Sequence, residues 1–220
     1  MMRYLLYFFY LEWYWGFRLA RFILRQEISG EKKYGIHTIG FGNLPPATSV
    51  EDRKHLSRYE PLNYYTSSRL FSCLLPADFK STFLDVGSGK GRLLAMAAAY
   101  GFSDIIGIDL SKKLCETAIN VCRSIKTKYP NTSIQIENRD ARFYSIPESV
   151  GVIFLFNPFD AVIMDEFIGK VKESLIRKNR ALKILYANPQ CKQQWLEAGF
   201  TEIDSFVKWR YLQGSVLERK

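Results

Sequence analysis

The chain has 220 residues, 47% apolar side chains and a formal net charge of +9. A chain of this length buries one sizeable core, so we expect one globular domain with an N-terminal appendage. The basic excess is spread along the chain, with 9 basic and 5 acidic residues in positions 1–58 and 22 and 17 in positions 59–220. It therefore favours a polyanionic partner, nucleic acid or an anionic membrane, only weakly.

Cysteine and histidine usage excludes two kinds of site. The four cysteines have no CxxC spacing: Cys73, Cys115, Cys122 and Cys191. Both histidines, His37 and His55, precede the region in which strand and helix patterns alternate. We therefore expect neither a metal site nor a Ser-His-Asp triad in the core. Unpaired cysteines predict a reducing, cytoplasmic location.

The first 25 residues are unusually aromatic, with nine aromatic side chains between positions 4 and 17. The longest uncharged run, 4–11, has eight residues, whereas a membrane-spanning helix needs about twenty. Wound as one helix, the segment gathers its arginines and three tyrosines on one side: Arg3, Arg18, Arg21, Arg25, Tyr7, Tyr10 and Tyr14. We expect this helix to dock on its own domain or on a second subunit; the alternative is an interfacial helix on anionic lipid.

Residues 29–58 are rich in glycine and proline, which predicts a loop. A helical pattern follows at 62–75. Asn63 or Thr66 is placed to cap this helix, and Pro76 to end it.

From residue 82 onward, strand and helix patterns alternate, which predicts a parallel sheet with helices on both faces. The strand patterns are 82–86, 105–109, 133–137, 152–156 and 182–187. The helical patterns are 90–100, 112–128, 161–176 and 190–198. The last two strand-like runs, 200–209 and 211–217, leave no room for a helical crossover and are expected to be antiparallel neighbours. We divide the chain into an N-terminal appendage, 1–58, and an α/β domain, 59–220.

Residues 83–91 join an apolar strand to a helix through three glycines at alternate positions, Gly87, Gly89 and Gly91. Glycine at such points lets the chain turn tightly and lets a ligand approach the backbone. Asp109 closes the next apolar run, where a carboxylate accepts hydrogen bonds from ribose hydroxyls. The sequence therefore predicts a nucleoside-binding crevice.

Two other nucleotide-binding motifs do not fit this loop. A P-loop needs a glycine where Leu84 stands and a hydroxyl residue after Lys90, where Gly91 stands instead. The dinucleotide fingerprint needs its third glycine at the position of Arg92. We expect arginine there to block the close contact of helix and strand that glycine permits.

The remaining pattern, Asp-x-Gly-x-Gly-x-Gly from Asp85, resembles that of the S-adenosylmethionine-dependent methyltransferases of the seven-strand class, over about residues 59–217. The resemblance implies a Rossmann-like methyltransferase fold, a seven-stranded and mostly parallel sheet with an antiparallel C-terminal strand. It implies S-adenosyl-L-methionine as cofactor, with Asp85 facing the ammonium and sulfonium charges. The cofactor-binding residues it implies in this part of the chain are Asp85, Gly87, Ser88, Gly89, Gly91, Asp109 and Leu110.

Asp140 and Ala141 follow the predicted strand 133–137. At this place the family uses an acid and the next backbone amide to hold the adenine ring, which offers an amine donor and ring-nitrogen acceptors. The resemblance thus implies that both residues bind the cofactor. The alternative for Asp140 is a plain helix cap.

The apolar run 152–156 ends in Asn157-Pro158-Phe159, at the sheet edge where ligands bind in open α/β sheets. It resembles the Asn/Asp-Pro-Pro-aromatic motif of N-methylating members, with one proline fewer. The resemblance implies that Asn157 contacts the cofactor and orients an amine, and that Phe159 stacks on the acceptor. The alternative is a strand-ending turn followed by a core phenylalanine.

The segment Tyr59-Glu60-Pro61, with Tyr64 and Tyr65, resembles the loop that precedes the core in lysine-directed relatives. The resemblance implies that Glu60 binds the amino group of the cofactor and that the two later tyrosines line a lysine channel. The alternative for Tyr64 and Tyr65 is packing of an amphipathic helix.

We therefore expect a methyltransferase that acts on an amine nitrogen, with protein lysine as the favoured acceptor and Asn157 and Phe159 as catalytic residues. An amine needs little help from a base, which suits a core without histidine. A nucleic-acid base or a small molecule is the alternative acceptor. A non-catalytic cofactor binder or a membrane-associated interaction module is the alternative class. The sequence leaves the acceptor, the oligomeric state and peripheral membrane contact through residues 1–25 open.

Overall fold

The structure is a computed structural model that describes residues 2–40 and 59–220. Its helices are α1 (Met2–Trp15), α2 (Phe17–Tyr34), α4 (Tyr64–Phe71), α5 (Arg92–Tyr100), α6 (Lys112–Lys128), α7 (Ala161–Arg177) and α8 (Lys192–Glu197), with short 3-10 turns η1 (Asp78–Lys80) and η2 (Ala141–Phe143). Its strands are β1 (Thr82–Val86), β2 (Asp104–Asp109), β3 (Ser133–Asn138), β4 (Val150–Phe156), β5 (Leu182–Ala187), β6 (Thr201–Lys208) and β7 (Leu212–Arg219).

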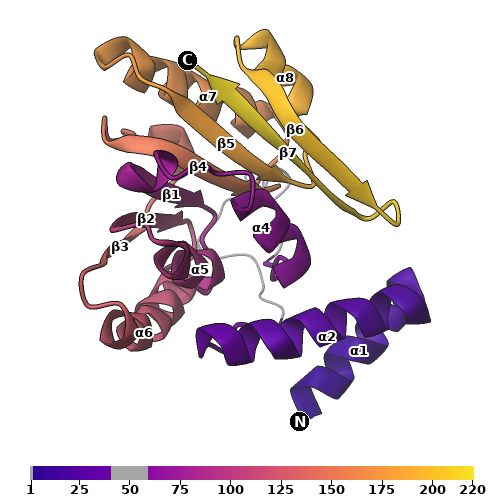
Figure 1. The fold of residues 1–220 in the computed structure, drawn as a ribbon. Helices are drawn as coiled ribbons and strands as arrows, with labels where there is room; N and C mark the ends of the chain where they lie inside the picture. Colours follow the sequence, from indigo (N-terminus) through magenta and orange to yellow (C-terminus); the bar gives the residue numbers. More distant parts are fainter. Residues whose placement is uncertain (1, 41–58) are drawn as a thin grey trace.

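The strands form one seven-stranded sheet in the order β3-β2-β1-β4-β5-β7-β6 (Figure 1). The first five are parallel to their neighbours, whereas β7 runs antiparallel to both β5 and β6. The predicted fold is therefore confirmed. The strand order reverses between β1 and β4, and in open α/β sheets the ligand crevice lies at the carboxyl ends of the strands at such a point.

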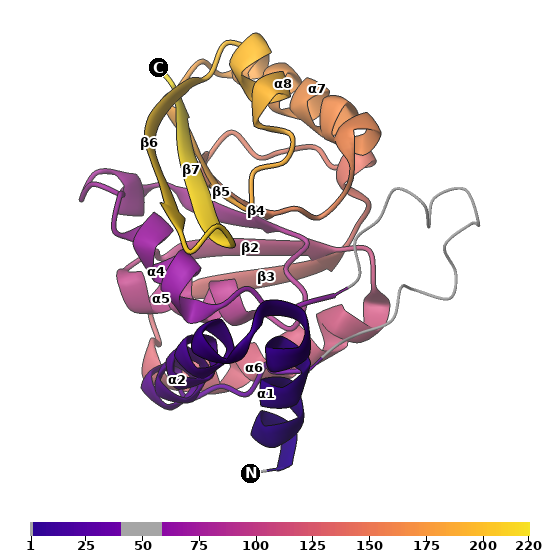
Figure 2. The ribbon, with the colours of Figure 1, turned by 90° about the vertical axis from the view of Figure 1, so that its right-hand side faces the viewer.

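Each face of the sheet carries an apolar core, because successive strand side chains point to opposite faces. Phe83 and Phe154 belong to the core shared with α4, α5 and α6. Leu84 and Ile153 belong to the core shared with α7 and α8. Figures 1 and 2 show α7 and α8 on one side of the sheet and α4, α5 and α6 on the other, as the alternating pattern predicted.

The helix predicted at 62–75 is shorter in the structure, where it spans Tyr64–Phe71. Asn63 caps it, accepting a hydrogen bond from the Thr66 amide at 2.8 Å. Beyond Phe71 the backbone changes to tighter, 3-10-type turns. The Cys73 amide donates to the Leu70 carbonyl and the Leu74 amide to the Phe71 carbonyl, each three residues back. These tighter turns end the helix before Pro76.

The prediction of a single N-terminal helix is wrong, because the helix is interrupted at Gly16, between α1 and α2. The φ angle of Gly16 is 82°, in the left-handed region that glycine adopts most easily. Arg3 therefore does not share a helix face with Arg18, and its guanidinium instead lies 3.4 Å from the Glu31 carboxylate. The predicted loop also begins later than position 29, since α2 continues to Tyr34. Residues 35–40 lie in a loop, as predicted. The remainder of that predicted loop, 41–58, lies outside the described residues.

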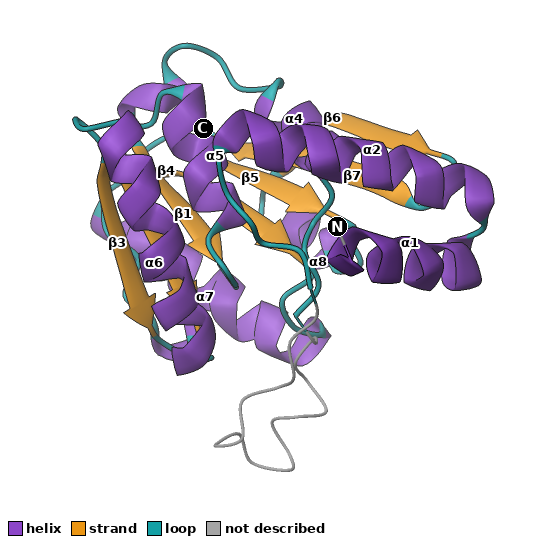
Figure 3. Cartoon of the chain, turned by 90° about the horizontal axis from the view of Figure 1, so that it is seen from below, coloured by secondary structure: helices purple, strands orange, loops and turns teal. Residues whose placement is uncertain are grey.

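Helix α2 packs beside α4 and α5, and α1 packs on α2, on the side of the molecule away from α7 and α8 (Figures 1 and 3). Tyr7 and Leu11 of α1 form a small apolar cluster with Ile23 of α2 and with Leu212 at the start of β7. The expectation that this segment docks on its own domain is confirmed for this inner face. None of the helices within residues 2–40 and 59–220 is both long and apolar enough to cross a membrane.

Candidate functional site

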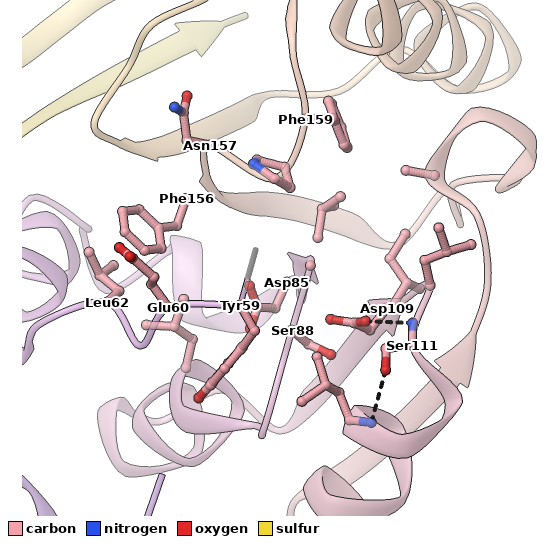
Figure 4. A pocket seen from close by; sticks show the side chains of 18 of the residues that line it. Tyr59, Glu60, Leu62, Asp85, Ser88, Asp109, Ser111, Phe156, Asn157 and Phe159 are labelled. Carbon is pink, nitrogen blue, oxygen red and sulfur yellow. Dashed lines mark hydrogen bonds between the residues drawn. The ribbon is translucent and has the colours of Figure 1, made fainter. Parts of the chain in front are cut away.

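A cavity of about 360 Å³ opens at the carboxyl ends of the parallel strands. Its lining comes from the loops after β1, β2, β3 and β4 and from the segment that precedes α4 (Figure 4). Most of the predicted site residues line it: Glu60, Asp85, Gly87, Ser88, Asp109, Leu110, Asp140, Ala141, Asn157 and Phe159. The predicted Gly89 and Gly91 do not belong to this lining.

The three glycines of the loop after β1 meet different neighbours. All three have positive φ angles, between 54° and 82°. A Cβ on Gly87 would approach the Pro158 ring to 3.1 Å, so Gly87 lies at the cavity wall. A Cβ on Gly89 would clash with the edge of the Tyr59 ring, and one on Gly91 would lie 3.2 Å from Ala118 of α6. Gly89 and Gly91 thus allow close packing behind the cavity.

Asp109 holds the loop in shape through both carboxylate oxygens. One accepts the Gly89 amide at 2.8 Å. The other accepts the Ser111 amide at 2.8 Å (Figure 4). Burial raises the pKa of Asp109, although these two backbone bonds oppose the rise. Each carboxylate oxygen has a second lone pair, so Asp109 can also accept hydrogen bonds from ligand hydroxyls.

Asp85 is buried with unused hydrogen-bonding capacity. It is 2% exposed, and one of its carboxylate oxygens has no partner among the described residues. Burial, together with the negative charge of Asp109, raises the pKa of Asp85 well above its ordinary value. The Ser88 hydroxyl, also in the cavity wall, likewise has no partner within the described part of the chain. Unpaired buried groups are costly, so this wall is built for a polar ligand, with a cation favoured at Asp85.

Asp140 acts as a helix cap, the alternative that the sequence left open. Its carboxylate accepts the Arg142 amide at 2.9 Å and pairs with the Arg142 guanidinium at 2.6 Å. It also lines the cavity together with Ala141. The cap fixes the position of the Asp140 carboxylate and of the backbone at Ala141.

Asn157 follows the end of β4 with a φ angle of 45°, in the left-handed region. Its side-chain oxygen lies 3.4 Å from the Tyr186 hydroxyl, which also accepts the Cys191 amide at 3.3 Å. Because the Cys191 amide donates to the Tyr186 oxygen, the hydroxyl hydrogen of Tyr186 is free to be donated to the Asn157 oxygen. One oxygen of the cavity wall is thereby oriented by the neighbouring strand β5.

Two phenylalanines flank Asn157 in sequence, and both line the cavity. Phe159 is 6% exposed and packs edge-on against Phe167 of α7, with ring centroids 5.9 Å apart. Phe156 is half-buried and lies near Asn157, Leu62 and Glu60 (Figure 4). Phe156 was missed from the sequence, because a fully apolar strand gives no periodic sign of which side chain faces the ligand.

Glu60 enters the cavity wall from the segment before α4, and α1 contacts it. The Tyr10 hydroxyl donates to the Glu60 carboxylate at 3.0 Å. Burial, and after it this hydrogen bond, raises the pKa of Tyr10 to about 12. Tyr64 and Tyr65, the candidate channel residues, do not line the cavity and pack against other aromatic rings. Tyr64 stacks on Tyr34, and Tyr65 meets Phe22 and Phe206 edge-on. The amphipathic packing alternative is therefore the one observed.

Arg92 links the cavity to α2 and does not obstruct the sheet. Its guanidinium pairs with the buried Glu27 carboxylate at 2.7 Å and donates to the Leu62 carbonyl at 2.6 Å. The close approach of α5 to β2 instead occurs at Gly107, where a Cβ would lie 2.8 Å from Leu94. The glycine that permits this contact thus lies on the strand and not in the loop.

The fold and this cavity define a class of protein. A seven-stranded sheet with an antiparallel end, a glycine loop after β1 and acids at the ends of β1 and β2 are the features of the class I, Rossmann-like methyltransferases. Their cofactor, S-adenosyl-L-methionine, combines two positive centres with ribose hydroxyls and an adenine ring. The unpaired Asp85 oxygen, the open lone pairs of Asp109 and the fixed backbone at Ala141 suit those groups.

Comparison with protein families agrees with this class. Residues 83–177 match the family described as a methyltransferase domain. The chain therefore contains a class I, S-adenosylmethionine-dependent methyltransferase domain. Over 58 residues it is 36% identical to EEF1A lysine methyltransferase 2 of Danio rerio, a match that covers 26% of this chain and 24% of that protein. The matched stretch thus spans about a quarter of that relative's length.

Solved structures share the fold at low sequence identity. The ribosomal protein L11 methylase of Lactobacillus delbrueckii subsp. bulgaricus superposes with a TM-score of 0.53 and 16% identity, over 73% of this chain and 81% of that one. An RNA methyltransferase of Salinibacter ruber in complex with S-adenosyl-L-homocysteine superposes with a TM-score of 0.53 and 14% identity, over 72% of this chain and 92% of that one. At such identities the likeness concerns the fold.

Proposed function

We propose that this protein transfers a methyl group from S-adenosyl-L-methionine to an amine nitrogen, with the lysine side chain of a protein as acceptor. The observation that carries the proposal is the cavity in which the buried, unpaired Asp85 oxygen and the oriented Asn157 oxygen both belong to the wall. The partial match to a lysine methyltransferase supports the choice of acceptor.

We assign the cofactor-binding roles residue by residue. S-Adenosylmethionine, when bound, supplies a methyl group on a positively charged sulfur. Asp85 and Glu60 are placed to neutralise positive charge, and Asp109 accepts from the ribose hydroxyls. Asp140 and Ala141 hold the adenine ring. The loop from Gly87 to Gly91, with Ser88, gives the backbone its close approach, and Leu110 covers the ligand from the end of β2.

The acceptor is oriented by Asn157 in this proposal. Its side-chain oxygen accepts a hydrogen from the amine, which fixes the direction of the nitrogen lone pair. Tyr186 holds the amide of Asn157 in place. Phe159 shapes the wall through its contact with Phe167, and the more exposed Phe156 ring offers a face to the amine. The amine accepts the methyl group in its deprotonated form, because only that form carries the nitrogen lone pair.

For location and organisation, we propose a cytoplasmic protein with an N-terminal appendage, 1–58, and a methyltransferase domain, 59–220. The four free cysteines support a reducing compartment, and three of them are buried.

The proposal is tested by replacing Asn157 without straining its backbone. Asn157→Gly removes the amide, and glycine adopts the left-handed φ of this position readily. We expect the kcat for methyl transfer to fall about a hundredfold, because the acceptor loses its orientation, while the Kd for S-adenosylmethionine in calorimetry changes far less. Asn157→Asp keeps an acceptor oxygen and should retain more activity than the glycine variant.

The acceptor is identified by transfer of labelled methyl groups into a cell lysate treated with nuclease or with protease. We expect the label to survive nuclease and to be lost on protease treatment, and mass spectrometry to find methylated lysine. Label that is lost with nuclease would replace the lysine proposal with a nucleic-acid one. Absence of S-adenosylmethionine binding in calorimetry would overturn every enzymatic version.

A further inference from the structure

The outer face of α1 is an unbroken apolar stripe. Its side chains recur at helical spacing and are highly exposed: Met2 77%, Leu5 56%, Leu6 66%, Phe9 57% and Trp13 85%. The stripe lies opposite Tyr7 and Leu11, which are buried against the rest of the protein. The helix is thus already docked on its own domain and still presents a second apolar face, far more than the scattered apolar residues of an ordinary surface.

Aromatic side chains from a distant part of the chain extend this surface. The turn between β6 and β7 brings Tyr211 to Trp15, with ring centroids 5.4 Å apart, and Trp209 to Phe22, at 4.9 Å. Trp209 and Tyr211 are each 51% exposed. Tryptophan and tyrosine are the residues that favour the boundary between lipid and water, because they combine an apolar ring with a polar group.

The charges around this surface are mainly positive, although α1 itself carries the partly exposed Glu12. On α2, Arg18, Arg21 and Arg25 are exposed and follow each other on the side away from its buried residues. The two acids of α2 are turned inward and paired, Glu27 with Arg92 and Glu31 with the Thr38 amide among others. Lys208 and Arg210 add positive charge at the β6–β7 turn. A lipid surface with negative headgroups complements this arrangement.

We propose that α1, the arginine row of α2 and the β6–β7 turn form a surface that docks on anionic lipid membranes. The apolar stripe of α1 enters the boundary region of the bilayer, and the cations contact the headgroups. The surface is convex, since the two helices protrude from the side of the domain (Figures 1 and 2). A flat bilayer accepts such a protrusion without a matching groove. Because Tyr10 on α1 contacts Glu60, docking also brings the cavity close to the lipid.

Binding to vesicles tests this proposal with the full chain. Vesicles of phosphatidylcholine mixed with phosphatidylglycerol should carry the protein upward in flotation, and vesicles of phosphatidylcholine alone should carry far less. Three of the four tryptophans, Trp13, Trp15 and Trp209, lie on the surface, whereas Trp195 is buried. Anionic vesicles should therefore shift tryptophan emission to shorter wavelength.

Variants separate the apolar contribution from the charge. Phe9→Asp with Trp13→Asp should abolish flotation, while the matched pair Ile119→Asp with Ile176→Asp, exposed apolar residues of α6 and α7, should not. Arg18, Arg21 and Arg25 changed together to Gln should lower the partition coefficient about a hundredfold. The same change at Lys113, Arg123 and Lys126, which are exposed on α6, should lower it far less.

Two results would overturn the proposal. One is a wild-type chain that ignores anionic vesicles, and the other is equal loss of binding in the matched controls. In the first case, a dimer in analytical ultracentrifugation that the Phe9 and Trp13 variant dissociates would show that a second copy covers the stripe. Far-UV circular dichroism confirms that each variant is folded, and every substituted side chain is exposed.

Discussion

At the residue scale, Asp85 shows how a binding role conflicts with stability. The fold places this carboxylate in the cavity wall, 2% exposed and with one oxygen unpaired in the described residues. A neutral side chain of the same shape would be better tolerated there. The arrangement makes sense if a positively charged ligand completes the site, and it yields a test that does not depend on knowing the acceptor.

Asp85→Asn should stabilise the ligand-free protein and weaken the binding of the cofactor. The amide removes a buried carboxyl whose pKa is raised well above 3.8, so we expect the free energy of unfolding to increase by about 1–3 kcal/mol at neutral pH. Calorimetry should show at least a tenfold weaker Kd for S-adenosylmethionine, because the positive centres lose their counter-charge.

The pH dependence of this gain has a defined sign. Above pH 3.8 the unfolded chain loses the Asp85 proton while the folded chain keeps it, so the wild type loses stability as the pH rises through that window. The advantage of Asp85→Asn should therefore vanish below pH 3.8 and grow as the pH increases. Urea titrations of both proteins between acid and neutral pH measure it. A variant that is less stable at neutral pH, or that binds the cofactor as well as the wild type, would refute this account.

At the element scale, short-range patterns defined the strands and helices of the sheet well. The strands at 82–86 and 182–187 and the helix at 112–128 begin and end as predicted. Such elements follow from local periodicity and caps, which adjacent residues encode. The glycine loop and its acids could be located for the same reason, since their spacing is local.

Contacts between distant segments could not be predicted in this way. From the sequence we expected Arg92 to block the contact of helix and strand. In the structure its guanidinium instead binds the carboxylate of Glu27, 65 positions earlier in the chain, and links α5 to α2. The orientation of Asn157 by Tyr186, across 29 positions, and the ligand-facing side of Phe156 depend on the packed sheet in the same manner. No local pattern carries such information.

The pair of Glu27 and Arg92 is the main polar link between α2 and α5. Both side chains are at most 5% exposed, and the Arg92 Nη2 atom lies 2.7 Å from Glu27 Oε2. Glu27→Gln leaves the guanidinium buried without its counter-charge, so we expect a loss of about 3–5 kcal/mol in unfolding free energy. Urea denaturation measures it.

A matched control for this loss is Glu173→Gln, in the Lys170 pair on the surface of α7, where Glu173 is 55% exposed. That change should cost less than about 1 kcal/mol. Combining Glu27→Gln with Arg92→Met should recover part of the loss, because no buried charge remains. Equal effects of the two glutamate variants would mean that the buried pair does not join the helices.

At the scale of the whole molecule, the N-terminal helices and the sheet domain share one packing system. Gly30 of α2 packs so closely on the Tyr64 ring that a Cβ would clash with three of the ring carbons. Tyr34 stacks on the same ring at 5.6 Å, and Arg92 lies over it at 4.3 Å. The proposed division at residue 58 therefore separates segments of the chain and not independent folding units.

We expect α2 to unfold together with the domain and not before it. In native-state hydrogen exchange, the most protected amides of α2 and of the central strand β4 should open with free energies that agree within about 1 kcal/mol. S-Adenosylmethionine at a hundred times its Kd should raise both by about 2.7 kcal/mol, because it binds the folded state alone. The amides of α1 should exchange faster, since only Tyr7 and Leu11 of that helix are buried. Protection of α2 that stays unchanged on cofactor binding, while that of β4 rises, would show that the helix opens independently of the domain.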